Sequence, residues 1–293
     1  MDGIERLLAS MHDAAAPGFL PFRVGAATAG WVRPTFAQAL RRFPDVFSHD
    51  ANGAVELNAG LGDPDARSHA MAAVTRELAK SGVITGWRDE LYEVRDEARP
   101  GHAPLLAIER AAARAFGITS RAVHVNGVTT AAAGPAMWIA RRSLSKPIDP
   151  GMLDNMIGGG VPAGMSMRET LVKEAWEEAG LTAAQAAAAR AGRQVRIRRA
   201  VPEGLQSEVI LVHDLELPPA VVPRNTDGEV SEFRLLPIAV VIDLLRQGGQ
   251  ITPDASLVIL DWLDRQGILP LPGTPAARAI FGPPGLPPSA TTP

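Results

Sequence analysis

The sequence predicts an α/β (α+β) chain of two domains, and three observations lead to this prediction. Segments with the strand pattern of alternating apolar residues are interspersed with segments whose apolar residues recur at helical spacing. A glycine-rich stretch beginning at Gly158 runs directly into a helix with its own start and stop signals. A third observation is the helix-ending Gly117-Ile118, which marks a domain boundary within a chain of 293 residues.

The composition is that of an ordinary globular protein and excludes several classes. Hydrophobic residues make up 46% and charged residues 21%, and the net charge of −3 gives no basic excess for nucleic acid. No apolar run approaches the roughly 18 residues of a membrane span, and the first residues lack the order of a secretory signal. Cysteine is absent, which rules out disulfides. We therefore expect a cytoplasmic protein with neither nucleic-acid nor membrane partners.

Residues 1–117 are predicted to form an α+β accessory domain. Pro34 is typical of a helix start, and Asn52-Gly53 predicts a hairpin. The elements expected in order are a helix over residues 1–20, strands within 19–32, a helix over 34–43, strands around 46–57, a helix over 63–81, a strand over 82–94 and a helix over 105–116.

Residues 118–269 are predicted to form the second domain, and residues 270–293 a Pro-rich, mostly extended or disordered tail. Two antiparallel strands are expected to begin the second domain, and a long loop carrying Lys146 to follow them. The full set is strands over 122–128 and 136–142, helices over 166–179 and 183–191, strands over 194–201, 207–217 and within 224–237, and helices over 238–246 and 256–266.

The stretch from Gly158 to Leu181 carries the chemical signal. Ser166 and Glu169 form a capping box that starts a helix, and Gly180 is a natural stop. One side of this helix is apolar and is predicted to face the core; its residues are Leu171, Val172, Ala175, Trp176 and Ala179.

The other side of the helix gathers Glu174, Glu177 and Glu178 at spacings i, i+3 and i+4. Three carboxylates on one face repel each other, and a hard divalent cation such as Mg²⁺ relieves that repulsion while it binds phosphate. The alternative is a solvated acidic face. The glycine stretch leading into the capped helix favours the cation.

This stretch resembles the Nudix box, whose pattern is G-x5-E-x7-R-E-U-x-E-E-x-G-U, with U a bulky aliphatic residue. Gly159 takes the first position, the three glutamates the acidic positions, and Gly180-Leu181 the end. The sequence departs from the pattern in having Met165 for the first Glu and Lys173 for the Arg. Lysine lacks the forked contact that arginine makes.

Four further runs resemble a Nudix subfamily named for its fusion to thiamine pyrophosphokinase. They are WRDELYEV at 87–94, HVNGVT at 124–129, WIARRSLSKPIDPGMLDNMIGGGVPAG at 138–164 and RNTDGEVSEFRLL at 224–236. Members of this subfamily carry an extra N-terminal domain. The resemblance implies a Nudix α/β/α sandwich with a mixed sheet and a Mg²⁺- or Mn²⁺-dependent diphosphatase acting on thiamine diphosphate or its oxidised analogues. A homodimer is common for this fold.

The same resemblance, together with residue chemistry, supplies candidate site residues. Glu174, Glu177, Glu178 and the Gly158 carbonyl are expected to hold the metal, and the attacking water needs a base. Candidates for the base are Glu174 and the downstream Glu229 and Glu232, with Glu208 weaker. Residues expected to touch substrate are Arg141, Arg142, Lys146, Asn155, Gly159 and Gly160.

Several alternatives remain at this point. The basic residues before the box are equally consistent with a solvated strand end. Trp87, Arg88 and Tyr92 either pack a domain interface or line a pocket. The substrate could instead be ADP-ribose, a nucleotide sugar or a dinucleotide, and Met165 with Lys173 would also suit a non-catalytic ligand sensor. An isomerase of allylic diphosphates ranks last, because it usually relies on a cysteine and the chain has none.

Overall fold

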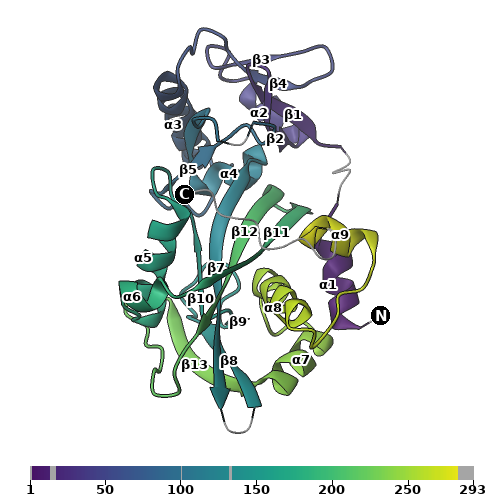
Figure 1. Ribbon diagram of the computed structural model, residues 1–293. Helices are drawn as coiled ribbons and strands as arrows, with labels where there is room; N and C mark the ends of the chain where they lie inside the picture. Colours follow the sequence, from purple (N-terminus) through teal and green to yellow (C-terminus); the bar gives the residue numbers. More distant parts are fainter. Residues whose placement is uncertain (1, 14–17, 100, 132–133, 283–293) are drawn as a thin grey trace.

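The computed structural model describes residues 2–13, 18–99, 101–131 and 134–282. It has an N-terminal domain, at the top of Figure 1, resting on a larger domain built around a long mixed sheet. Within these described ranges, no helix is both long and apolar enough to cross a membrane.

The N-terminal domain packs helices and short β-hairpins around an aromatic core. Its main sheet has the order β2-β1-β4-β3. The rings of Phe22 and Phe36 lie 5.2 and 5.0 Å from that of Phe116, so the segment before the domain boundary closes this core. The elements are β1 (Leu20–Val24), β2 (Ala27–Val32), α2 (Pro34–Leu40), β3 (Phe47–His49), β4 (Val55–Leu57), α3 (Pro64–Lys80), β5 (Leu91–Val94), β6 (Leu106–Glu109), the 3₁₀ helix Arg110–Ala112 and α4 (Ala113–Phe116).

The hairpin predicted at Asn52-Gly53 is confirmed, but two other predictions in this domain are wrong. Residues 82–90 are irregular, and the strand begins only at Leu91. The helix predicted over 105–116 is a strand in its first part, because Leu106 and Ile108 alternate with less buried neighbours and pair with β5. Only its last four residues form α4, which ends at Gly117 in the left-handed conformation (φ 56°).

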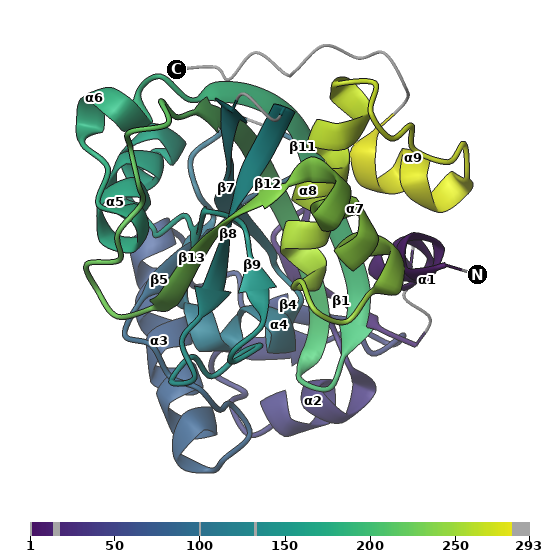
Figure 2. The ribbon, with the colours of Figure 1, turned by 90° about the horizontal axis from the view of Figure 1, so that it is seen from below.

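The larger domain is an α/β/α sandwich, as expected. Its sheet has the order β11-β12-β7-β8-β13, with β10 on β7 and β9 on β8, and β12 runs parallel to β7. Figure 2 shows α5 and α6 on one side of this sheet and α7 and α8 on the other. The elements are β7 (Thr119–Ala131), β8 (Gly134–Arg142), β9 (Leu153–Asp154), β10 (Ile157–Gly160), α5 (Met167–Ala179), α6 (Ala183–Ala186), β11 (Arg190–Val201), β12 (Gly204–Glu216), β13 (Val230–Pro237), α7 (Ile238–Gln247) and α8 (Pro253–Arg265).

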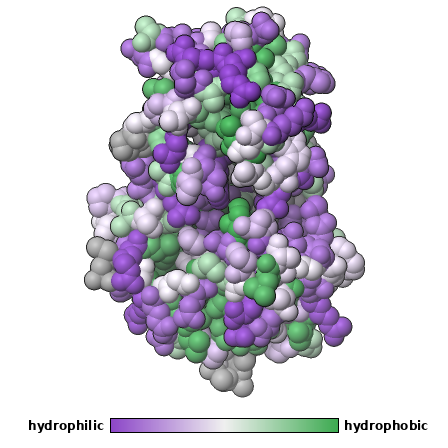
Figure 3. All heavy atoms as spheres, turned by 180° about the vertical axis from the view of Figure 1, so that it is seen from behind, coloured by the Kyte–Doolittle hydropathy of each residue, from purple (hydrophilic) through white to green (hydrophobic). Residues whose placement is uncertain are grey.

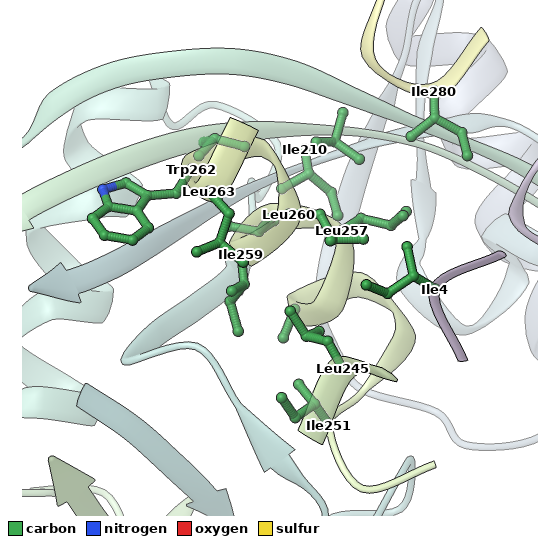
Figure 4. Packing of buried hydrophobic residues seen from close by; sticks show 14 of the residues in the cluster. Ile4, Ile210, Leu245, Ile251, Leu257, Ile259, Leu260, Trp262, Leu263 and Ile280 are labelled. Carbon is green, nitrogen blue, oxygen red and sulfur yellow. The ribbon is translucent and has the colours of Figure 1, made fainter. Parts of the chain in front are cut away.

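Each face of the sheet has its own apolar core. On the α8 face, Ile210 meets Leu257 and Leu260, among other residues of the cluster shown in Figure 4. On the α5 face, strand residues such as Val123 pack against Leu171, Ala175 and Ala179 of the helix. The predicted apolar side of α5 is therefore confirmed at these three positions, but Trp176 is 57% exposed.

Both ends of the described chain pack against the α8 face of the larger domain. Helix α1 (Gly3–Met11) buries Ile4 and Leu8 there, so it lies with the second domain rather than with the accessory domain to which residues 1–117 were assigned. Helix α9 (Pro275–Phe281) buries Ile280 and Phe281 in the same cluster. The expected disorder from residue 270 is therefore wrong for α9, because two large apolar side chains anchor this segment; residues 283–293 lie outside the described part.

The helix in the alanine-rich run after α5 is shorter than predicted. A helix was predicted over 183–191, but α6 stops at Ala186 and β11 starts at Arg190. The alanines favour a helix locally, but they offer little surface to bury, and pairing of β11 with β12 determines the outcome.

Candidate active site

Strand β10 and helix α5 place the predicted glycines and glutamates against each other. The capping box of Ser166 and Glu169 starts α5, and Gly180 ends it in the left-handed conformation (φ 64°), as predicted. The glycines themselves lie in β10 rather than in a loop, and they pair with His124 and its neighbours on β7. A rigid strand and a capped helix therefore carry the site.

Glu178 is the most buried acid of the predicted set, with 6% exposure. Its Oε2 accepts a hydrogen bond of 2.8 Å from the backbone amide of Gly158. Burial raises the pKa of Glu178 to about 8, and the nearby carboxylate of Glu174 adds to the rise, while the Gly158 amide and Lys146 oppose it. This carboxyl therefore keeps its proton to a higher pH than an exposed glutamate does.

Glu174 lies one helical turn before Glu178 and faces the next residue of β10. A Cβ on Gly159 would overlap the Glu174 carboxyl, so only glycine allows this approach. The Glu174 side chain is 12% exposed, and burial raises the pKa of its carboxyl. The predicted importance of Gly159 thus has a steric explanation.

Lys173 occupies the position where the Nudix pattern has arginine, and it joins two of the acids. Its Nζ lies 3.1 Å from Oε1 of Glu174 and 2.6 Å from Oε2 of Glu177. Although burial opposes the charge, these hydrogen bonds raise the pKa of Lys173. Glu177 is more exposed, at 37%, and in this arrangement its carboxylate is neutralised by the lysine.

Two basic side chains line the same very small cavity as Glu178, and its volume of about 10 Å³ has room for about one water molecule. Lys146 and Arg142 line it, as do Asn155, Asp154 and Glu229. Lys146 Nζ contacts Glu229 Oε2, and Arg142 Nη1 donates to Asp154 Oδ2 at 2.7 Å. Burial lowers the pKa of Lys146, and Glu178 opposes that shift. The structure therefore brings together Lys146, Arg142, Asn155 and Glu229 from the predicted set.

Asn155 is buried, and its side chain is hydrogen-bonded within a series of polar side chains next to the site. Its Oδ1 lies 2.9 Å from Nδ1 of His124, and its Nδ2 donates to Asn126 Oδ1 at 2.9 Å. Asn126 in turn donates to Asp214 Oδ1 at 3.0 Å. A Cβ on Gly158 would lie 2.9 Å from the His124 ring, so these hydrogen-bonded side chains also pack directly against β10.

Two predicted residues, Glu232 and Arg141, lie outside this arrangement, and so does the weaker base candidate Glu208, which lines a separate cavity. Glu232 pairs with Arg234 and Arg141 on the exposed surface of β13 and β8, and these pairings lower its pKa. Arg141 Nη1 donates to the carbonyl of Gly151 at 2.7 Å, which holds the loop after β8. Neither side chain lines the cavity at Glu178.

Residues of the N-terminal domain reach the same region, and the sequence left their role open. A Cβ on Gly160 would overlap the hydroxyl of Tyr92. The guanidinium of Arg110 lies 5.4 Å from the centre of the Tyr92 ring, and its Nη1 is 2.6 Å from Oε2 of Glu90. Arg110 was not identified from the sequence; it falls in the segment predicted as a helix over 105–116.

Comparison with known proteins agrees with this geometry. Residues 120–255 match the NUDIX domain model, and residues 4–120 match a domain of unknown function, DUF4743. Nudix hydrolase 24, chloroplastic, of Arabidopsis thaliana is 40% identical over 264 residues, which cover 86% of this chain and 68% of that protein. Nudix hydrolase 20, chloroplastic, of the same plant is 38% identical over 260 residues, covering 86% and 69%. The protein belongs to the Nudix hydrolase family.

As a Nudix hydrolase, the protein acts on diphosphates, and its larger domain has the Nudix fold. Among solved structures, the NUDIX domain of Shewanella oneidensis NrtR complexed with ADP ribose aligns with a TM-score of 0.42 and 15% identity, over 52% of this chain and 91% of that one. The Nudix box is the segment from Gly159 to Leu181, and its helix is α5.

Nudix hydrolases generally use divalent metal ions, which bind oxygen donors such as carboxylates. Among the residues that the structure describes, no three Asp, Glu, His or Cys side chains form a ready-made metal cage. The carboxyl of Glu178 is nevertheless buried and that of Glu174 is largely buried, both have raised pKa values and both face β10. Burial disfavours the charged form of a carboxylate, and a hard cation bound to its oxygens stabilises that form. The box fits a divalent cation at this pair, with Glu177 held by Lys173.

Proposed function

We propose that this Nudix hydrolase cleaves the phosphoanhydride of thiamine diphosphate or an oxidised analogue, giving the monophosphate and inorganic phosphate. The observation that carries the hydrolytic part is the position of the buried Glu174 and Glu178 against the β10 glycines, opposite Lys146 and Arg142. The thiamine part is supported by the resemblance of residues 87–94, 124–129, 138–164 and 224–236 to the thiamine-related subfamily.

The site residues are proposed to have two roles, metal binding and phosphate binding. Glu174, Glu178 and the Gly158 carbonyl are proposed to hold Mg²⁺ or Mn²⁺, with Glu177 joining once it leaves Lys173. The cation, when bound, neutralises the diphosphate and activates water. Lys146 and Arg142 are proposed to bind phosphate oxygens, for which an ammonium and a guanidinium are well suited.

Hydrolysis adds the oxygen of water to one phosphorus and breaks the bridging P–O bond, and the proton lost by water ends on the products. Glu229 is the proposed base, because it lies beside Lys146 at the edge of the cavity that Glu178 lines. Glu174 is the second candidate. Glu232 is no longer one, because its carboxylate is committed to two arginines away from the cavity.

The test is a product analysis with purified protein. Thiamine diphosphate, its oxo derivative, ADP-ribose and a dinucleoside polyphosphate are incubated with Mg²⁺, and products are separated by chromatography while phosphate is quantified. Thiamine monophosphate, or its oxo form, together with phosphate supports the proposal, and excess chelator must abolish the reaction. Turnover of ADP-ribose to AMP and ribose phosphate, with the thiamine compounds intact, would instead assign a nucleoside diphosphate derivative as substrate.

A further inference from the structure

We propose that the N-terminal domain forms one wall of the substrate site, and that the cavity between the two domains holds the organic group of the diphosphate. The inference deepens the proposed function and rests on it. It also assigns a role to the segment that matches the domain of unknown function.

The small cavity at Glu178 cannot hold a whole substrate. The cavity beside Glu178 has room for about one water molecule, so the organic part of a substrate must lie elsewhere. The cavity between the domains measures about 320 Å³, which is within the range of small-molecule sites. Figure 3 shows the molecule hollowed at the level where the two domains meet.

The two cavities share a loop. Lys146 lines the small cavity, and the next residues, Pro147 and Ile148, line the large one. Arg110 lines the large cavity and is close enough to contribute, by its charge, to the lowered pKa of Lys146. A diphosphate at Lys146 would therefore have its organic end directed into the space between the domains.

The N-terminal wall is fixed to the Nudix box. The backbone amide of Ala163 donates to the carbonyl of Leu91 at 2.7 Å, and that of Gly164 donates to Glu93 Oε1 at 3.1 Å. The hydroxyl of Tyr92 packs on Gly160. Strand β5 thus holds the connection between β10 and α5, and a movement of this domain would disturb the box itself.

The two walls indicate what the cavity accepts. Arg110 stacked over Tyr92 gives a flat polar surface, suited to a planar ring. Strands β12 and β7 of the larger domain contribute Gln206, Glu208 and Ser120 to the lining of the cavity. Carboxylate, amide and hydroxyl groups accept hydrogen bonds from N–H or O–H donors. The expected occupant is a polar, ring-sized group with hydrogen-bond donors, attached to a diphosphate.

The absence of cysteine from the chain allows a direct test. Single cysteines are introduced at Ala111 and at Ser207, one lining residue from each domain, and at Ala51 as an exposed control in the β3–β4 turn. Labelling by a maleimide is timed with calcium in place of magnesium to slow turnover. We expect the organic diphosphate that is hydrolysed to slow labelling of A111C and S207C at least fivefold, while inorganic pyrophosphate has no effect on either and A51C is never protected.

The outcomes separate this inference from the proposed function. A compound that is hydrolysed but leaves A111C and S207C labelled at the free rate overturns the cavity assignment and leaves the diphosphatase intact. Protection without hydrolysis supports the cavity and overturns the diphosphatase. If no compound of the panel is hydrolysed and none protects, both proposals fail.

Arg110→Ala provides a second measurement. We expect KM for the organic diphosphate to rise about tenfold with kcat changed less than threefold, because the interaction lost is with a group that does not react. Arg23→Ala, which breaks partly exposed ion pairs with Asp50 and Glu56 elsewhere in the domain, is the matched control and should leave both constants unchanged. Equal KM values for R110A and wild type would contradict a binding role for this wall.

Discussion

The carboxylate of Glu178 accepts a hydrogen bond from the backbone amide of Gly158, and this contact joins the end of the Nudix helix to the strand that leads into it. The acid is buried, carries a raised pKa and lies opposite Lys146. A residue near the C-terminal end of α5 is thereby placed beside Gly158, the residue just before the box, 20 positions earlier in the chain.

Glu178→Gln should lower kcat by at least about 10²-fold, the order typically lost with one charge-stabilising group. Glutamine keeps the acceptor for the Gly158 amide, so thermal unfolding without added metal should be nearly unchanged. The matched control is Glu232→Gln, whose carboxylate pairs with Arg141 and Arg234 outside the site and whose loss should change kcat less than twofold. Steady-state kinetics give kcat for both variants. A larger loss of kcat in Glu232→Gln than in Glu178→Gln would place the catalytic acid on β13.

Lys173→Met should make the protein more dependent on divalent cation. Without metal, the variant leaves Glu174 and Glu177 without the ammonium that now pairs with both, so its melting temperature should fall. With excess Mg²⁺ the melting temperature should rise further for the variant than for wild type, because the cation no longer competes with lysine. Melting curves with and without Mg²⁺ measure this, and an equal Mg²⁺-induced rise in the two proteins would contradict it.

Gly160→Ala should destabilise the protein by about 1–3 kcal/mol, as overpacking usually does. A methyl group there would overlap the Tyr92 hydroxyl, so the two domains would have to shift. Tyr92→Phe in the same chain should recover part of the loss. Gly62→Ala, at a position with open space around it, is the control and should be nearly neutral. Urea unfolding of the single and double variants supplies the numbers, and additive losses in the double variant would show that the two groups do not meet.

Asp254→Asn should change how stability depends on pH. Burial raises the pKa of Asp254 to about 6, and Glu208 and Asp154 raise it further while His124 and Arg199 lower it. The folded state therefore keeps a proton that the unfolded state releases near pH 4, so wild type loses stability as pH rises from about 4 to about 6. The asparagine variant should lack this loss. Urea midpoints at pH 4.5 and pH 7 test the sign, and parallel changes in the two proteins would refute it.

The box helix was predictable because its determinants are local. Ser166, Glu169 and Gly180 act within one or two turns, so start, stop and the inward side at Leu171 and Ala175 follow from spacing alone. The exposure of Trp176 could not be predicted in this way, since the same spacing places it at the edge of the apolar side and only the neighbouring elements decide whether that edge is covered.

Long-range pairing explains the other errors. Residues 105–109 have an acceptable helical pattern, yet hydrogen bonds with β5 make them a strand. Residues 275–281 look like part of a Pro-rich tail, yet Ile280 and Phe281 are buried in the core, where α9 packs against α1 and β11. In each case the partner lies far enough along the chain that local composition carries no information about it.

By itself the sequence determined the class of chemistry, because the Nudix box requires its glycines and acids at fixed separations along one strand and one helix. Only the tertiary structure decided which acids are buried, which of the basic residues face them, and that Tyr92 and Arg110 of the other domain stand beside the box. The physical reason is that burial and charge pairing depend on which surfaces meet, and those surfaces come from segments tens of residues apart.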